Sequence, residues 1–143
     1  MSKTIMIADD SASMRSLVKE CLEGLDVEII EVTNGYKALK ALTQHHFDLM
    51  ILDINMPEMS GLEVLGFTKK HESYREIRII IISTDHNEAD VKKGLALGAD
   101  RYLIKPFQME RMRSEVSEMM ANDHPIPVVT DRLALLHTNW SQF

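Results

Sequence analysis

The 143-residue sequence has one cysteine, four prolines and one tryptophan, and it has no apolar run long enough to span a bilayer. Because Cys21 has no second cysteine in its own chain, an intrachain disulfide is excluded. The N-terminus also lacks the apolar core of a secretion signal. We therefore expect a soluble, cytoplasmic protein that has no membrane partner.

Positive charge is scarce as well, with 16 lysines and arginines against 22 aspartates and glutamates and a formal net charge of −6. This balance disfavours binding to a phosphate backbone, so no direct nucleic-acid partner is expected.

Hydrophobic residues make up 45% of the chain. At this length they can form the core of one compact domain but not of two ordinary ones.

Short apolar runs alternate along the chain with amphipathic stretches of helical period. This pattern predicts an α/β fold, in which crossover helices connect the strands of a parallel sheet. The expected helix after Gly61 should have Phe67 on its apolar face, and the expected helix at 108–120 should have Met109 on its apolar face. Strands are expected at residues 4–8, 27–32, 49–53, 77–83 and 101–105, with helices from Ser11 or Ser13 to Gly24, after Gly35, after Gly61, at 88–97 and at 108–120.

Polar side chains follow the expected strands at their carboxyl ends, where ligands bind in open parallel sheets. Three carboxylates gathered there would raise one another's pKa values unless a cation neutralised them. Hard oxygen ligands of this kind suit Mg²⁺. A lysine and a hydroxyl opposite them are the groups needed to hold a phosphoryl group during its transfer to a carboxylate. The strand-end residues are Asp9, Asp10, Asp53, Ser83 and Lys105.

Five motifs in this order resemble those of response-regulator receiver domains of two-component signalling, most closely the stand-alone chemotaxis type. The resemblance extends over about residues 2–121. It implies a doubly wound, flavodoxin-like parallel sheet of five strands in the order 2-1-3-4-5, with helices on both faces. The motifs are ADDSASMR (8–15), NGYKAL (34–39), DLMILDINMPEMSGLEVL (48–65), IIISTD (80–85) and GADRYLIKPF (98–107).

The resemblance also implies roles for individual residues around the expected metal site. Asp53 matches the phosphoacceptor, while Asp9 and Asp10 match the acidic pair that binds Mg²⁺ together with Asp53. The backbone carbonyl of Asn55 would complete the protein ligands. In the turn after Asp53, Gly61 is expected to supply backbone freedom.

Further residues match the positions that respond to the phosphoryl group in members of this family. Lys105 matches the lysine that pairs with phosphoryl oxygens, and its bond to Pro106 is expected to be cis. Ser83 matches the switch hydroxyl. Tyr102 matches the switch aromatic residue, which turns from exposed to buried when the hydroxyl moves.

The function implied by this resemblance is a signalling switch rather than turnover of a free metabolite. A histidine kinase or phosphotransfer protein would donate the phosphoryl group in a Mg²⁺-dependent step, and the switched domain would bind a downstream protein. The domain would catalyse only its own phosphoryl transfer and hydrolysis. Asn55 and Asp85 occupy the positions that tune self-dephosphorylation, and their side chains can orient an attacking water.

The last residues depart from the minimal family pattern. We expect a receiver domain over residues 1–121, then a proline-containing linker and a short amphipathic helix over residues 122–143, with Leu133, Leu136 and Trp140 on one stripe. This tail could dock on its own receiver domain or pair with a second copy. A dimer could also form through the face between the fourth and fifth helices. Alternatively, the chain is a fragment of a longer response regulator whose output domain is absent.

Three other functional classes fit the sequence less well. A phosphohydrolase of the haloacid dehalogenase type needs a second aspartate where Asn55 stands. A flavodoxin-like FMN carrier needs a first loop that attracts phosphate, whereas Asp9 and Asp10 would repel it. A degenerate receiver domain that acts only as a binding module would lack a site residue, and none is missing.

Overall fold

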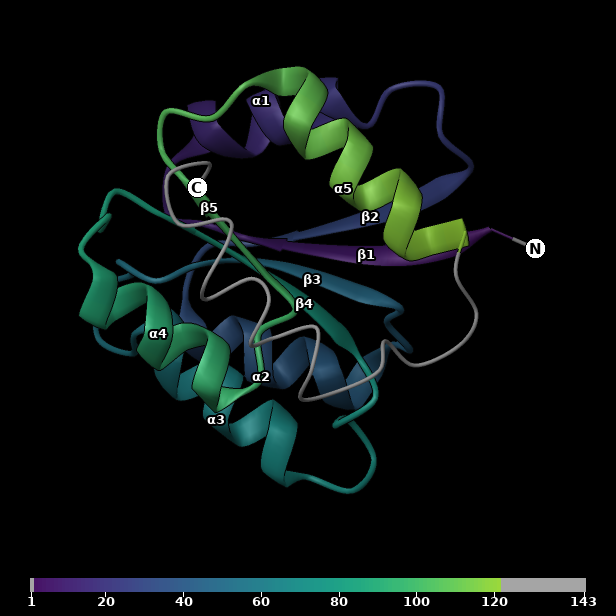
Figure 1. The fold of residues 1–143 in the computed structure, drawn as a ribbon. Coiled ribbons are helices and arrows are strands. Elements are labelled where there is room, and N and C mark those ends of the chain that lie inside the picture. Colours follow the sequence, from purple (N-terminus) through teal and green to yellow (C-terminus); the bar gives the residue numbers. More distant parts are fainter. Residues whose placement is uncertain (1, 122–143) are drawn as a thin grey trace.

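The structure is a computed structural model that describes residues 2–121. The predicted linker and helix of residues 122–143, including Trp140, lie outside the described residues. Strands and helices alternate throughout the described part (Figure 1). They are β1 (Lys3–Ala8), α1 (Ala12–Cys21), β2 (Val27–Val32), α2 (Gly35–Gln44), β3 (Leu49–Asp53), α3 (Gly61–Lys70), β4 (Arg78–Ser83), α4 (Glu88–Leu97), β5 (Arg101–Ile104) and α5 (Met109–Ala121).

The five strands form one parallel sheet in the order β2-β1-β3-β4-β5, which confirms the predicted doubly wound fold. Helices α1 and α5 cover one face, and α2, α3 and α4 cover the other (Figure 1). Each face has its own apolar core, because side chains on a strand alternate between the two sides of the sheet. No helix of residues 2–121 is both long and apolar enough to cross a membrane.

The middle of the sheet is the most apolar part of the molecule. All five residues of β3 are buried, and residues 79–82 of β4 have no exposed surface. The uninterrupted isoleucine run of β4 therefore forms an inner strand covered on both sides. The burial of β3 also means that a polar residue at its end emerges directly from the core.

Helix α1 begins where the sequence predicts but ends earlier. The Ser11 hydroxyl caps its start by accepting a hydrogen bond from the Met14 backbone N–H, at 3.2 Å. The helix ends at Cys21 rather than at Gly24, because the chain turns at Leu22, whose N–H bonds to two helix carbonyls. Gly24 lies beyond the helix, in the turn, with a positive φ of 87°.

Two residues expected on the apolar helix faces are exposed instead. Phe67 is 41% exposed. The residues of α3 that face the core are spaced three and four positions apart and include Val64 and Thr68, and Phe67 does not belong to this set. Its ring lies near His71 and Tyr74 on the surface. Met109 is 39% exposed, because it is the first residue of α5, one turn before the first buried side chain.

Candidate functional site

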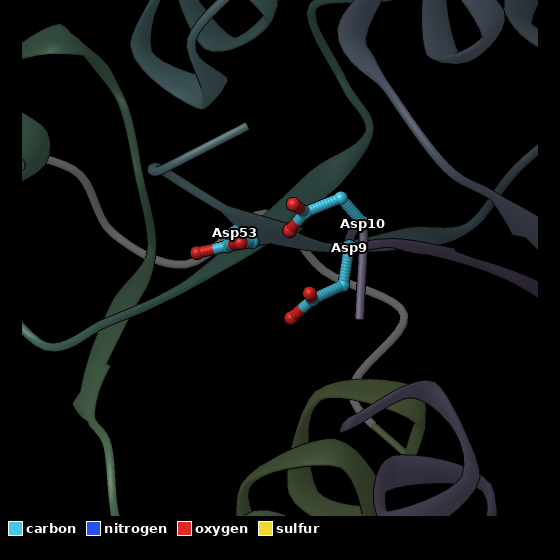
Figure 2. Close-up of side chains that lie close together, drawn as sticks. All are labelled: Asp9, Asp10 and Asp53. Carbon is cyan, nitrogen blue, oxygen red and sulfur yellow. The ribbon is translucent and has the colours of Figure 1, made fainter. Parts of the chain in front are cut away.

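Three carboxylates meet at the carboxyl end of the sheet. Asp9 and Asp10 directly follow β1, and Asp53 is the last residue of the neighbouring strand β3. One oxygen atom from each of the three lies within 4.8 Å of the others (Figure 2). Asp9 and Asp53 are buried, whereas Asp10 is exposed, so the group opens to solvent on one side.

The start of α1 holds Asp9 in place. Its carboxylate accepts a hydrogen bond from the Ser11 backbone N–H at 2.9 Å, and its backbone carbonyl accepts one from the Arg15 guanidinium at 2.9 Å. Ser11 is also the helix cap, so one residue both starts α1 and orients the acid. Sequence reasoning assigned no role to Arg15, although it lies in the first quoted motif, because nothing local shows that its side chain returns to the Asp9 backbone.

Lys105 is the cation that faces these acids. Its ammonium lies 3.2 Å from a carboxylate oxygen of Asp9 and 3.3 Å from one of Asp53. Lys105 comes one residue after β5, and its backbone N–H donates to the Ser83 carbonyl at 2.7 Å. The peptide bond between Lys105 and Pro106 is cis.

The acidic group carries more negative charge than Lys105 can balance. Burial raises the pKa of the Asp53 carboxyl above its usual value, and the neighbouring Asp9 raises it further. Lys105 and the Asn55 backbone N–H, which donates to Asp53 at 3.2 Å, lower this pKa but do not cancel the rise. Clustered carboxylate oxygens with excess negative charge are the donor set that Mg²⁺ takes in proteins, so these residues fit such an ion.

Ser83 and Tyr102 both bind the backbone of Asp85. The buried Ser83 hydroxyl accepts a hydrogen bond from the Asp85 N–H at 2.9 Å. The Tyr102 hydroxyl donates to the Asp85 carbonyl at 2.9 Å, and its ring has no exposed surface. Burial raises the pKa of the Tyr102 phenol, and a hydrogen bond from Ser83 lowers it in part. Of the two orientations expected for this aromatic residue, the structure has the buried one.

In the turn after Asp53, Gly61 has a different structural role from the one expected. The residue with positive φ is Glu58, at 70°, and not Gly61. Gly61 is needed for space, because a Cβ atom there would collide with the backbone carbonyl of Asp53 and lie 2.9 Å from the Ile54 Cα. A hydrogen bond of 2.9 Å from the Gly61 N–H to the Ile54 carbonyl holds this close approach.

Because the pKa of Asp53 is raised, ionisation of its carboxyl is expected to lower the free energy of unfolding when no divalent cation is bound. Because the folded pKa lies above the unfolded one, the folded state holds more protons between the two values, so the free energy of unfolding falls as pH rises through that interval. Asp53→Asn should remove this fall and be more stable than the wild type at neutral pH. Urea unfolding in excess chelator across a pH series measures both effects.

The exposed Asp26 provides the matched control for that series. Asp26→Asn should follow the wild-type curve. Parallel curves for the wild type and Asp53→Asn would show that the ionised carboxylate carries no folding penalty.

Comparison with known proteins settles which family this site belongs to. The family described as the response regulator receiver domain matches residues 5–117. This chain belongs to that family. The matched residues include Asp9, Asp10 and Asp53, the loop after β3, and Lys105.

Individual receiver proteins resemble the chain in sequence and in structure. The response regulator GtcR of Aneurinibacillus migulanus is 34% identical over 96% of this chain, which spans 60% of that protein's length. The chemotaxis response regulator CheY4 of Vibrio cholerae is 28% identical, with 83% of this chain and 99% of that chain covered and a TM-score of 0.77. The Mn²⁺-bound form of the response regulator Rcp1 is also 28% identical, with coverage of 89% and 97% and a TM-score of 0.71.

Proposed function

We propose that this receiver domain is a switch in which Asp53 accepts a phosphoryl group from a histidine kinase or a phosphotransfer protein. In the phosphorylated state the domain would bind a downstream protein. The observation that carries this proposal is the contact of one ammonium group, that of Lys105, with both Asp9 and Asp53 at 3.2 and 3.3 Å. A buried carboxylate beside a cation at the open end of the sheet is what a nucleophile in phosphoryl transfer requires.

In the proposed reaction, a carboxylate oxygen of Asp53 attacks the phosphorus of a phosphohistidine. The new P–O bond forms as the P–N bond breaks, and the bonding electron pair stays on the departing imidazole nitrogen, which then takes up a proton. Lys105 already touches Asp53, so its ammonium can balance the charge on a phosphoryl oxygen. The product is an acyl phosphate on Asp53.

Mg²⁺ would be held by the carboxylates of Asp9, Asp10 and Asp53 and by the backbone carbonyl of Asn55. The Mn²⁺-bound Rcp1 structure supports a divalent cation in a related domain. Bound Mg²⁺ supplies positive charge that stabilises the oxygens of the transferring phosphoryl group. Asp9 is also held by Ser11 and Arg15, which fixes one ligand before any cation binds.

The switch would act through the loop that contains Asp85. Ser83 and Tyr102 each hold one side of the Asp85 peptide backbone. If the Ser83 hydroxyl turns to bond a phosphoryl oxygen, its contact with the Asp85 N–H is lost and the loop must rearrange. Rearrangement of this loop and of the start of α4 would carry the change to the surface. Asn55 and Asp85 are the side chains we propose to tune hydrolysis of the acyl phosphate.

Lys105 is expected to link phosphorylation to this rearrangement, because it is the protein cation beside Asp53. In the wild type, acetyl phosphate and Mg²⁺ should shift the amide NMR signals of Ser83, Asp85 and Tyr102. In Lys105→Ala those shifts should be lost even when intact mass shows that the protein is phosphorylated. Lys70→Ala, at an exposed position of α3, should shift as the wild type does. Wild-type shifts in phosphorylated Lys105→Ala would contradict this role.

The proposed receiver domain comprises residues 1–121, and residues 122–143 are an additional segment. The relatives differ in length, since the chain spans 99% of the CheY4 structure but 60% of GtcR. We propose that residues 2–121 act as a complete receiver unit, because α1 and α5 together cover the second face of the sheet (Figure 1).

A further inference from the structure

A cavity of about 270 Å³ opens at the end of the sheet opposite to Asp53. It lies where β1, β3 and β4 begin and where α5 ends, a region seen beside the N-terminus in Figure 1. Its apolar wall includes Phe47, Tyr74, Ile77, Met119 and Met120. Polar and charged side chains from the loops before β3 and β4 form its rim.

The apolar wall of the cavity is part of the folded core. Phe47 and Met119 are 1% exposed and Ile77 is 7% exposed, so the apolar wall is continuous with the core. The guanidinium of Arg78, in β4, donates to the backbone carbonyl of Met119 and joins the end of α5 to the sheet. The ring of Tyr74 is held by stacking on His71, with ring centroids 4.4 Å apart.

We propose that residues 123–129 of this same chain dock in the cavity, with Ile126 as the inserted side chain. The last described residue, Ala121, comes directly after Met119 and Met120, which line the cavity. Five further residues can span up to about 17 Å, which is ample to place Ile126 in it. The segment reads Asp-His-Pro-Ile-Pro-Val-Val, in which five apolar residues follow a polar pair and the two prolines reduce the conformational entropy lost on docking.

The tether favours this occupant over others. A segment attached at the rim has an effective concentration on the order of millimolar, which a second copy or an unrelated protein rarely matches in solution. Docking there would anchor the tail at the edge of the sheet away from Asp53. The phosphorylation site and its loops would stay open, so this inference stands independently of the proposed function.

Photocrosslinking of the full-length protein tests the docking directly. An aliphatic diazirine amino acid replaces Ile126, and a second variant carries it at Gln142 as the control. Light and isotopically heavy chains are mixed before irradiation. We expect the probe at position 126 to label peptides that contain Phe47, Tyr74, Ile77 or Met119 within the same chain. The probe at position 142 should not label them.

Hydrogen exchange of Ile126→Asp gives a second readout that does not depend on the probe. A carboxylate would be desolvated against the apolar wall of the cavity, so amides of residues 74–78 and 117–121 should exchange several-fold faster than in the wild type, while Ser141→Asp leaves them unchanged. Crosslinks only between light and heavy chains would assign the cavity to a second copy and overturn the proposal. Crosslinks to other surfaces, or none together with unchanged exchange in Ile126→Asp, would also overturn it.

Discussion

Asp53→Asn is expected to abolish labelling of the protein by radiolabelled acetyl phosphate in the presence of Mg²⁺. The amide is uncharged and a far weaker nucleophile than a carboxylate, so the attacking group is lost while the shape of the side chain is kept. The fold should persist, because the asparagine oxygen can still accept the bond from the Asn55 N–H and the buried charge is gone. Labelling should fall below detection.

Asp26→Asn is again the matched control, since it makes the same chemical change at an exposed residue. Its labelling should equal that of the wild type. Circular dichroism and thermal melting of both variants confirm that they are folded. Undiminished labelling of folded Asp53→Asn would mean that another residue accepts the phosphoryl group.

Gly61→Ala is expected to produce the largest loss of stability, lowering the free energy of unfolding by about 3 kcal/mol. The added methyl group would meet the backbone carbonyl of Asp53 and the Ile54 Cα, and backbone atoms cannot rotate away as a side chain can. The turn and the end of β3 must separate to make room. Because Asp53 itself would move, labelling should fall as well.

Gly66→Ala, five residues later in α3, separates this steric effect from helix propensity. A Cβ atom at Gly66 would meet nothing within 4 Å, so alanine there should stabilise the protein by about 0.5–1 kcal/mol. Urea unfolding of both variants provides the comparison. A neutral Gly61→Ala would show that the contact with Asp53 is looser than the structure indicates.

The sheet and its strand-end acids were predictable from the sequence because both depend on local patterns. Alternating strand and helix periods specify a parallel sheet, and such a sheet brings the residues after β1, β3 and β5 to one edge. Asp9, Asp53 and Lys105 therefore meet as expected. No side-chain detail is needed for that conclusion.

Features that depend on tertiary contact were not predictable in the same way. The return of Arg15 to the Asp9 carbonyl and the close contact of Gly61 with Asp53 depend on how the chain folds back after β1 and β3, which no hydrophobic periodicity specifies. Phe67 is exposed because small differences in the rotation of α3 decide which apolar residues face inward. The buried orientation of Tyr102, whose hydroxyl donates to the Asp85 carbonyl, depends on packing between β5 and the loop after β4.

The most direct test of the central claim is to locate the acyl phosphate on the wild-type protein. The protein is incubated with acetyl phosphate and Mg²⁺, or with excess chelator, and treated with borohydride, which reduces an aspartyl phosphate to an alcohol and releases phosphate. Peptide mass spectrometry then finds the reduced residue. We predict reduction at Asp53 alone, and only with Mg²⁺. No reduced residue, reduction at Asp9 or Asp10 instead, or equal reduction in chelator would contradict the account.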